Sequence, residues 1–220
     1  LREQGILDES AALSERDPTQ PAWDDEAYKA WQAMRMEVYA AQIDRMDRGV
    51  GRILETLEAE GQFDNTLVIF LSDNGASDEV LPLVELERFK ERSDILRVRT
   101  RDGRPVQIGN EPGIAPGGED TYASYGRAWA NLSNTPFRYY KRWVHEGGIA
   151  TPFIVHWPDG GLDNGNVVRK PFQLTDVMPT ILEATGAAYP AQYNGRDIIP
   201  FEGRSILPAL RGKSSPDGTL

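Results

Sequence analysis

The longest regular pattern of hydrophobic and polar positions lies in residues 24–60. Apolar side chains recur there at three- and four-residue spacing, which predicts a long amphipathic helix that Gly61 ends as a C-cap. Gly49 and Gly51 each cost about 1 kcal/mol relative to alanine inside a helix, so we expect both to mark close packing against a sheet. We expect the apolar stripe to belong to the core; its members are Tyr28, Trp31, Met34, Val38, Ile43, Met46, Val50, Ile53, Leu54 and Leu57.

Two apolar runs predict strands. Residues 66–71 are rich in β-branched and aromatic types, which is typical of a strand buried on both faces. Residues 149–157 contain a second apolar run, which Pro158 stops. Because a helix followed directly by a strand is the unit of mostly parallel sheets, we predict an α/β fold with a mostly parallel sheet flanked by helices.

The rest of the chain divides into shorter segments. We predict a loop at residues 1–23, one α/β domain over 24–212 with an insertion at about 76–120, and a tail at 213–220. Within that domain, Thr175 and Asp176 cap a short helix that reaches Gly186, and we expect no further strand after it.

Asp102-Gly103 inside the insertion predicts a two-residue hairpin. The flanking residues Arg97, Arg99 and Arg101 would then share one face. That basic face fits an anionic substrate or an ordinary solvated surface, and the pattern leaves both interpretations open.

The first predicted strand ends in Asp73, Asn74 and Gly75. Ligand crevices of open α/β sheets lie just outside the carboxyl ends of the strands. Carboxylate and amide oxygens are the ligands that Ca²⁺ and Mg²⁺ prefer, and glycine lets the backbone turn away. The three residues therefore indicate a divalent metal site, or else an ordinary turn after a strand.

Composition narrows the function classes. The 220-residue chain has a formal net charge of −10, which disfavours a nucleic-acid partner. It has no cysteine, which excludes disulfides and thiolate chemistry. His145 and His156 are the only histidines, too few for a multi-histidine zinc site, and His156 is expected in the core. No apolar stretch approaches the ~20 residues of a transmembrane segment, and the start at Leu1 indicates an excerpt from a longer protein.

Ordered motifs resemble a known family. They are Asp73-Asn74-Gly75 after a hydrophobic strand, Lys141 four residues before His145-Glu146-Gly147-Gly148, Trp157-Pro158, Pro179-Thr180-Ile181-Leu182 and Gly203-Arg204-Ser205. In this order they resemble the second half of the sulfatases, arylsulfatase-like members of the alkaline phosphatase superfamily. The likeness spans most of residues 37–212, and it implies an incomplete sulfatase fold that lacks the N-terminal half and much of the C-terminal antiparallel sheet.

The resemblance implies residue roles. Asp73 and Asn74 would be ligands of a divalent metal, usually Ca²⁺, with Mg²⁺ possible. Lys141 would contact the sulfate and the ester oxygen, where its ammonium stabilises charge on the leaving group. His145 and Glu146 would anchor the loop that carries Lys141.

The family nucleophile is missing from this chain. In the family a formylglycine arises from a Cys/Ser-x-Pro-x-Arg motif, whereas the similar pattern here begins with Asn134, an amide that cannot become an aldehyde. We therefore expect the chain alone to be inactive and to be a portion of a sulfatase. A phosphate- or phosphonate-ester hydrolase of the same superfamily and a truncated, non-catalytic binding homologue are the alternatives.

The resemblance also implies a substrate class and a location. The substrate would be a sulfated small molecule or carbohydrate, and a periplasmic or secreted location is expected. Aromatic side chains close to Lys141 in the sequence suit a sulfated sugar or an aryl sulfate alike; they are Trp129, Tyr139, Tyr140 and Trp143.

Overall fold

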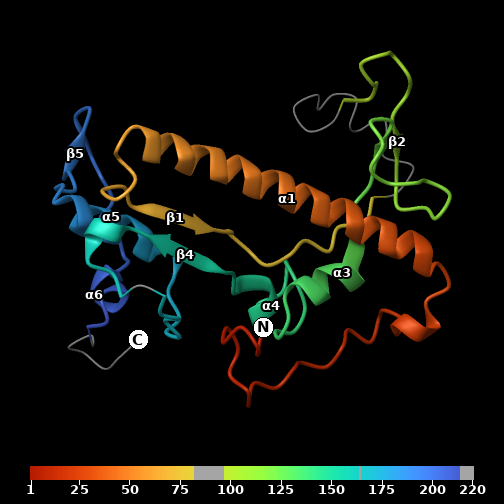
Figure 1. The fold of residues 1–220 in the computed structure, drawn as a ribbon, viewed down its shortest axis with the longest axis horizontal. Coiled ribbons are helices and arrows are strands. Elements are labelled where there is room, and N and C mark those ends of the chain that lie inside the picture. Colours follow the sequence, from red (N-terminus) through yellow and green to blue (C-terminus); the bar gives the residue numbers. More distant parts are fainter. Residues whose placement is uncertain (82–96, 164, 214–220) are drawn as a thin grey trace.

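A computed structural model describes residues 1–81, 97–163 and 165–213 (Figure 1). Its longest element is helix α1 (Lys29–Ala59), preceded by the short helix η1 (Trp23–Asp25). Gly61 has a positive φ of 64°, and the Gln62 amide behind it donates to the Leu57 carbonyl at 2.8 Å. The predicted helix and its glycine stop are therefore confirmed, although the helix begins later than residue 24.

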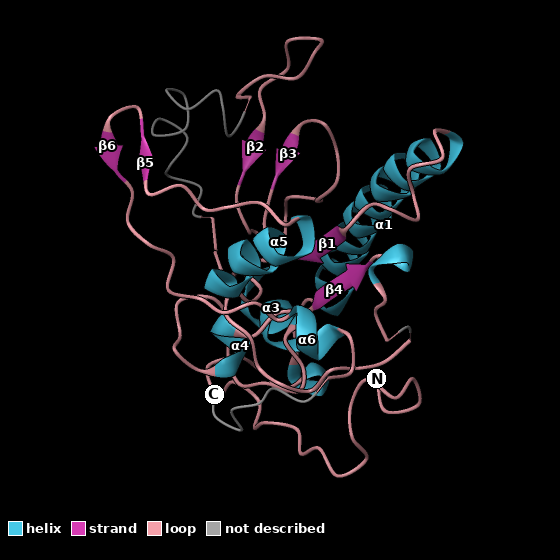
Figure 2. Ribbon diagram, turned by 90° about the vertical axis from the view of Figure 1, so that its left-hand side faces the viewer, coloured by secondary structure: helices cyan, strands magenta, loops and turns pink. Residues whose placement is uncertain are grey.

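The other elements of the described chain are short (Figure 2). In chain order they are β1 (Val68–Leu71), β2 (Gln107–Ile108), β3 (Thr121–Tyr122), α3 (Gly126–Ser133), α4 (Glu146–Ile149), β4 (Phe153–His156), η3 (Pro158–Gly160), η4 (Leu174–Asp176), α5 (Val177–Thr185), β5 (Gln192–Tyr193), β6 (Arg196–Asp197) and α6 (Leu207–Leu210). None of the helices formed by the described residues is long and apolar enough to cross a membrane. The mixture of helices and small sheets agrees with the predicted α/β class.

The sheets differ from the prediction in direction. Strand β1 pairs antiparallel with β4, so that Phe70 lies opposite Ile154. Among the described residues only β2 and β3 pair in parallel, over two residues each. The prediction of a mostly parallel sheet is wrong for this part of the chain, because an apolar run indicates a strand without indicating the direction of its partner.

The central strands are also less buried than predicted. Phe70 of β1 and Ile154 of β4, which lie opposite each other, are 36% and 58% exposed. Exposure alternates along β4. His156, expected in the core, is exposed beside the ring of Phe63. Burial on both faces is therefore wrong here, since no described segment covers the face that carries Phe70 and Ile154.

The apolar stripe of α1 shows the same difference. Ile53 is 62% exposed and Met46 is 46% exposed. A Cβ added at Gly49 or Gly51 would meet no atom within 4 Å, so neither glycine marks close packing against the sheet. The stripe is therefore not a buried core, and the two glycines do not mark close packing, so both expectations are wrong for the described chain. A helical stripe predicts which face is apolar, but it does not predict which residues pack against that face.

The C-terminal part follows the sequence more closely. Helix α5 ends at Gly186, which has the left-handed φ of 68° that suits a glycine C-cap. Beyond it, β5 and β6 form a hairpin around Asn194 and Gly195, both with positive φ. That turn geometry is the one which Asn-Gly favours, so the expectation of no further strand is wrong.

A small core lies beside β2. Val106 and Ile108 are buried there and pack against Leu81 and Tyr122. The buried side chain of Arg35 connects α1 to this region by donating twice to the Ser124 carbonyl, at 2.9 and 2.7 Å. Residues 82–96 of the predicted insertion lie outside the described residues.

Candidate functional site

The aspartate loop, residues 73–78, follows β1. Asp73 is exposed, and no hydrogen bond or ion pair engages its carboxylate within the described part of the chain. The Asn74 side chain is half-buried, and its amide nitrogen donates to the Gly75 carbonyl at 2.8 Å. Because this bond uses the nitrogen, it leaves the Asn74 amide oxygen free to act as a ligand.

The lysine loop, residues 134–148, lies directly against the aspartate loop. The Gly75 amide donates to the Gly148 carbonyl at 2.9 Å, and the Lys141 amide donates to the Ala76 carbonyl at 2.9 Å. The backbones of the predicted metal-ligand pair and of Lys141 are thus neighbours in space. The Lys141 side chain is half-buried, and its ammonium has no hydrogen bond or ion pair among the described residues.

Three glycines permit this contact. A Cβ at Gly75 would lie 1.8 Å from the Gly147 carbonyl oxygen. At Gly147 it would lie 2.2 Å from the Arg138 carbonyl oxygen, and at Gly148 it would lie 2.1 Å from that of Trp143. Since real Cβ atoms do not approach backbone so closely, Gly75 is a steric requirement of the contact between the loops, and Gly147 and Gly148 are requirements of the tight fold of the lysine loop on itself.

Asn134 joins the two loops through its side chain. Its amide oxygen accepts a hydrogen bond from Ala76 N–H at 2.9 Å, and its amide nitrogen donates to the Tyr139 carbonyl at 3.0 Å. The sequence drew attention to Asn134 only as a residue that cannot be the nucleophile. Its structural role was missed because its partner Ala76 is 58 positions away.

Asp17, near the start of the chain, also holds the lysine loop in place. The Tyr140 hydroxyl donates to its carboxylate at 2.8 Å, and both side chains are buried. Burial and the hydrogen bond to Asp17 raise the pKa of Tyr140 to about 12. Burial acts to raise the pKa of Asp17 as well, but hydrogen bonds from Thr19 and Tyr140 outweigh it and lower that pKa below its usual range.

His145 and Glu146 lie where the lysine loop enters α4. The Gly148 amide donates to the His145 carbonyl at 2.8 Å, and the Ala150 amide donates to the Glu146 carbonyl at 2.7 Å. Both side chains are exposed, and the His145 ring lies 5.2 Å from that of Tyr139. Their backbones therefore hold the loop, while a role for their side chains stays a prediction.

The aromatic residues near Lys141 in the sequence separate into two groups. Tyr139 stacks on Trp143, with ring centroids 4.4 Å apart, beside the lysine. Trp129 instead packs against Trp23 and helps to line a cavity of about 360 Å³ that also includes Phe137. None of the five residues predicted for the site lines this cavity or a smaller one of about 190 Å³ beside Arg35.

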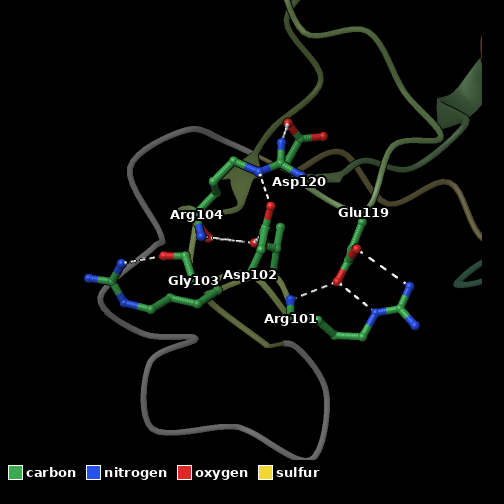
Figure 3. A network of polar contacts seen from close by, with 8 residues as sticks. Arg101, Asp102, Gly103, Arg104, Glu119 and Asp120 are labelled. Carbon is green, nitrogen blue, oxygen red and sulfur yellow. Dashed lines mark hydrogen bonds and ion pairs between the residues drawn. The ribbon is translucent and has the colours of Figure 1, made fainter.

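The predicted hairpin exists, and two arginines of its turn, Arg101 and Arg104, are paired with carboxylates (Figure 3). Thr100 N–H donates to the Arg104 carbonyl at 2.9 Å, so the loop between them has three residues and not two. Arg101 pairs with Glu119 at 3.1 Å, while Arg104 pairs with Asp102 and Asp120 at 2.9 Å each.

Figures 1 and 2 show the segment around β2, which contains this hairpin, above α4 and apart from it. The lysine loop leads into α4, so the hairpin lies away from the predicted site residues of that loop. This position favours the interpretation of the hairpin as an ordinary solvated surface over binding of an anionic substrate.

The donor set fits part of a metal site. Asp73 and Asn74 offer two adjacent hard oxygens at the end of β1, which suits Ca²⁺ or Mg²⁺. Within residues 1–81, 97–163 and 165–213 no cluster of three or more His, Cys, Asp or Glu side chains could hold a metal ion. Since Ca²⁺ takes six to eight oxygens, the remaining ligands have to come from outside this set.

Comparison with known proteins identifies the family. The sulfatase family model matches residues 9–187. The chain belongs to the sulfatase family. It is 31% identical to an arylsulfatase of Klebsiella aerogenes over 209 residues, and 32% identical to the uncharacterized sulfatase PB10D8.02c of Schizosaccharomyces pombe over 187 residues. It is also 32% identical to the mouse steryl-sulfatase over 174 residues.

These alignments cover most of this chain but less than half of each relative. They include 94%, 83% and 79% of this chain, and 41%, 31% and 20% of the Klebsiella, yeast and mouse proteins. Two solved structures are similar at lower identity. The phosphonate monoester hydrolase SpPMH from Silicibacter pomeroyi has a TM-score of 0.41 at 22% identity, covering 79% of this chain and 21% of its own. Ps i-CgsB, solved with a neocarrahexaose, has a TM-score of 0.49 at 23% identity, covering 89% and 31%.

Proposed function

We propose that this chain forms the metal-ligand and lysine portion of an enzyme that hydrolyses sulfate esters. The observation that carries the proposal is the contact between the two loops, in which Lys141 N–H donates to Ala76 O and Gly75 N–H donates to Gly148 O. This contact sets the Lys141 backbone beside the loop that offers Asp73 and Asn74. Membership of the sulfatase family supports the same reaction class.

The roles follow from the chemistry of each side chain. Lys141 would donate to the ester oxygen and stabilise the negative charge that develops there as the sulfur–oxygen bond breaks. Asp73 and Asn74 would supply two ligands of a divalent cation, Ca²⁺ or Mg²⁺. When bound, that cation would supply a positive charge for a sulfate oxygen. His145 and Glu146 would hold the lysine loop in place.

The nucleophile would come from residues outside this chain. A formylglycine requires a cysteine or serine precursor, and the chain has no cysteine and begins its Pro-Arg pattern with Asn134. We therefore propose that these 220 residues are inactive alone and belong to an alkaline phosphatase-like sheet completed by further sequence. The domain division at residues 24–212 and a periplasmic or secreted location remain parts of this proposal.

The substrate would be a sulfated small molecule or carbohydrate. Tyr139 and Trp143 present stacked rings near Lys141, which suits an aryl or sugar ring. A phosphate- or phosphonate-ester hydrolase of the same superfamily is the second candidate, and a non-catalytic binding protein is the third. Turnover of matched aryl sulfate, phosphate and phosphonate esters separates these candidates.

The test uses the full-length protein with two substitutions. We expect Lys141→Ala to lower sulfate-ester turnover to a small, measurable residue and keep the bound metal, and Asp73→Asn to lose both turnover and metal. Asp44→Asn, which removes an exposed ion-pair partner of Arg48 on α1, is the matched control and should change neither. Full turnover in the Lys141 variant would refute its role, and preferential phosphate or phosphonate hydrolysis would favour the second candidate.

A further inference from the structure

Asp78 is a buried carboxylate to which the mechanism above gives no role. It closes the aspartate loop, and it is 4% exposed, in contrast to the exposed Asp73 five positions earlier. Removing a carboxylate from water is unfavourable unless cations and hydrogen bonds compensate. The described chain therefore has to provide partners for Asp78 at this position.

Two arginines provide the compensation. Arg127 Nε lies 3.4 Å from Asp78 Oδ2, and Arg142 Nε lies 3.6 Å from Asp78 Oδ1. That Oδ1 atom is buried and has no hydrogen-bond partner among the described residues, so Arg142 is its nearest compensating charge. Arg127 belongs to α3, whereas Arg142 directly follows Lys141 in the lysine loop.

The backbone at Arg142 needs such a restraint. Its φ is 86°, in the left-handed region that side chains other than glycine rarely adopt. Because this conformation is intrinsically unfavourable for an L-residue, surrounding contacts have to hold it. The ion pair with Asp78 is a contact of this kind, and it acts on the residue next to Lys141.

Three successive residues of the lysine loop are held by different contacts. The Tyr140 hydroxyl donates to Asp17, the Lys141 amide donates to Ala76, and the Arg142 guanidinium pairs with Asp78. Of the side chains of Tyr140, Lys141 and Arg142, only the Lys141 ammonium has no hydrogen bond or ion pair among the described residues. The position of the Lys141 backbone is therefore set by the contacts of its two neighbours and of its own amide.

We propose that Asp78 is a positioning residue for Lys141. Its carboxylate holds Arg142, and through it the backbone on which the Lys141 ammonium is carried, against the loop of Asp73 and Asn74. This inference rests on the proposed function, since it assumes that Lys141 contacts the ester. Asp78 itself touches neither substrate nor metal in this account.

The experiment is a double-mutant cycle in the full-length protein. Asp78→Asn keeps the shape of the side chain and removes its charge. In the wild-type background we expect it to lower kcat for an aryl sulfate about 10- to 100-fold, since a small misplacement of a reacting group has effects of this size, with KM nearly unchanged. In a Lys141→Ala background the same change should leave the residual turnover unaffected, while the shift in Tm is equal in both backgrounds.

Further variants distinguish positioning from general structure. Arg142→Gln should lower kcat like Asp78→Asn while Asp78 keeps its pair with Arg127, and Arg142→Lys should restore most of the turnover. Asp44→Asn again serves as the control. An equal loss of turnover from Asp78→Asn in both backgrounds, or no loss in either, would overturn the inference.

The two proposals fail differently. If the wild type and Asp44→Asn hydrolyse no sulfate ester, the proposed function fails and this inference fails with it. If both hydrolyse the ester and Asp78→Asn does so equally well, the role of Asp78 alone is refuted. If Asp78→Asn does not fold, Arg142→Gln carries the test, and its unchanged kcat would refute the inference.

Discussion

The contact between the two loops and the apolar face of α1 are opposite kinds of surface. At the loops, a Cβ on Gly75 would overlap the Gly147 carbonyl oxygen, so backbone fills all the space there. On α1, a Cβ on Gly51 would meet nothing within 4 Å, and Ile53 beside it is 62% exposed. The candidate site is thus held by contacts within this chain, whereas the described residues leave Ile43, Met46 and Ile53 of the helix stripe exposed.

The largest effect should come from Gly75→Ala. The added methyl group would collide with backbone, which cannot move aside as a flexible side chain can, so the two loops would have to separate. We expect the full-length protein to lose about 3 kcal/mol or more of unfolding free energy, at the upper end of overpacking effects. Urea denaturation measures this loss, and sulfate-ester turnover should fall with it.

Gly51→Ala is the matched control on the other surface. Alanine is a better helix former than glycine by about 1 kcal/mol, and the structure leaves room for its methyl group. We therefore expect a small gain in stability from the same chemical change. A loss at Gly51 as large as that at Gly75 would contradict the contrast between the two surfaces.

A smaller effect should come from Tyr140→Phe, which removes the hydrogen bond to Asp17. A bond to a charged acceptor contributes about 1.5–3 kcal/mol, so we expect a loss in that range near neutral pH. The pKa of Tyr140 is raised to about 12 in the folded state, above its ordinary value of about 10. Its stabilising contribution is therefore complete below about pH 10 and is lost as the pH rises towards 12.

The pH profile tests this assignment. Wild-type unfolding free energy should fall between about pH 10 and 12 more steeply than that of Tyr140→Phe. Asp17, whose pKa is lowered in the folded state, contributes stability above its unfolded pKa of about 3.9, which is lost as the pH falls through its folded pKa. Tyr193→Phe, at an exposed ring, should leave the profile unchanged; identical alkaline slopes for wild type and Tyr140→Phe would contradict the assignment.

The smallest effect should come from Arg101→Gln in the hairpin. Its guanidinium is exposed and pairs with Glu119, and exposed ion pairs contribute little to stability. Since the segment around β2 that contains the hairpin lies apart from α4, we also expect an unchanged KM for sulfate esters. A clear rise in KM would return the hairpin arginines to the substrate site.

Much of the local structure could be predicted because its causes are local. The apolar spacing and Gly61 predicted α1 and its end, and Gly186 predicted the end of α5. The order of Asp73-Asn74-Gly75, Lys141 and His145-Glu146-Gly147-Gly148 indicated a sulfatase, and the structure sets the first motif against the other two through backbone hydrogen bonds.

The remainder depends on partners far apart in the chain. The direction of β4 against β1, the hydrogen bond of Tyr140 to Asp17 over 123 positions, and the ion pair of Asp78 with Arg142 leave no periodic trace in the sequence. Which residues pack against the apolar stripe of α1 also depends on contacts between segments far apart in the chain. A stripe shows that a surface is apolar, and only three-dimensional contacts show whether anything lies upon it.

The Asn134 side chain has a consequence for chain length. By accepting from Ala76 N–H it brings the two ends of residues 76–134 to one point, and the candidate site lies outside this closed segment. Loop-closure entropy grows slowly, by about 0.6 kcal/mol for each doubling of a flexible loop. Asp78, which pairs with Arg142 beside Lys141, lies inside this segment, so we expect additions or deletions in the segment to leave the geometry around Lys141 unchanged where they spare that ion pair.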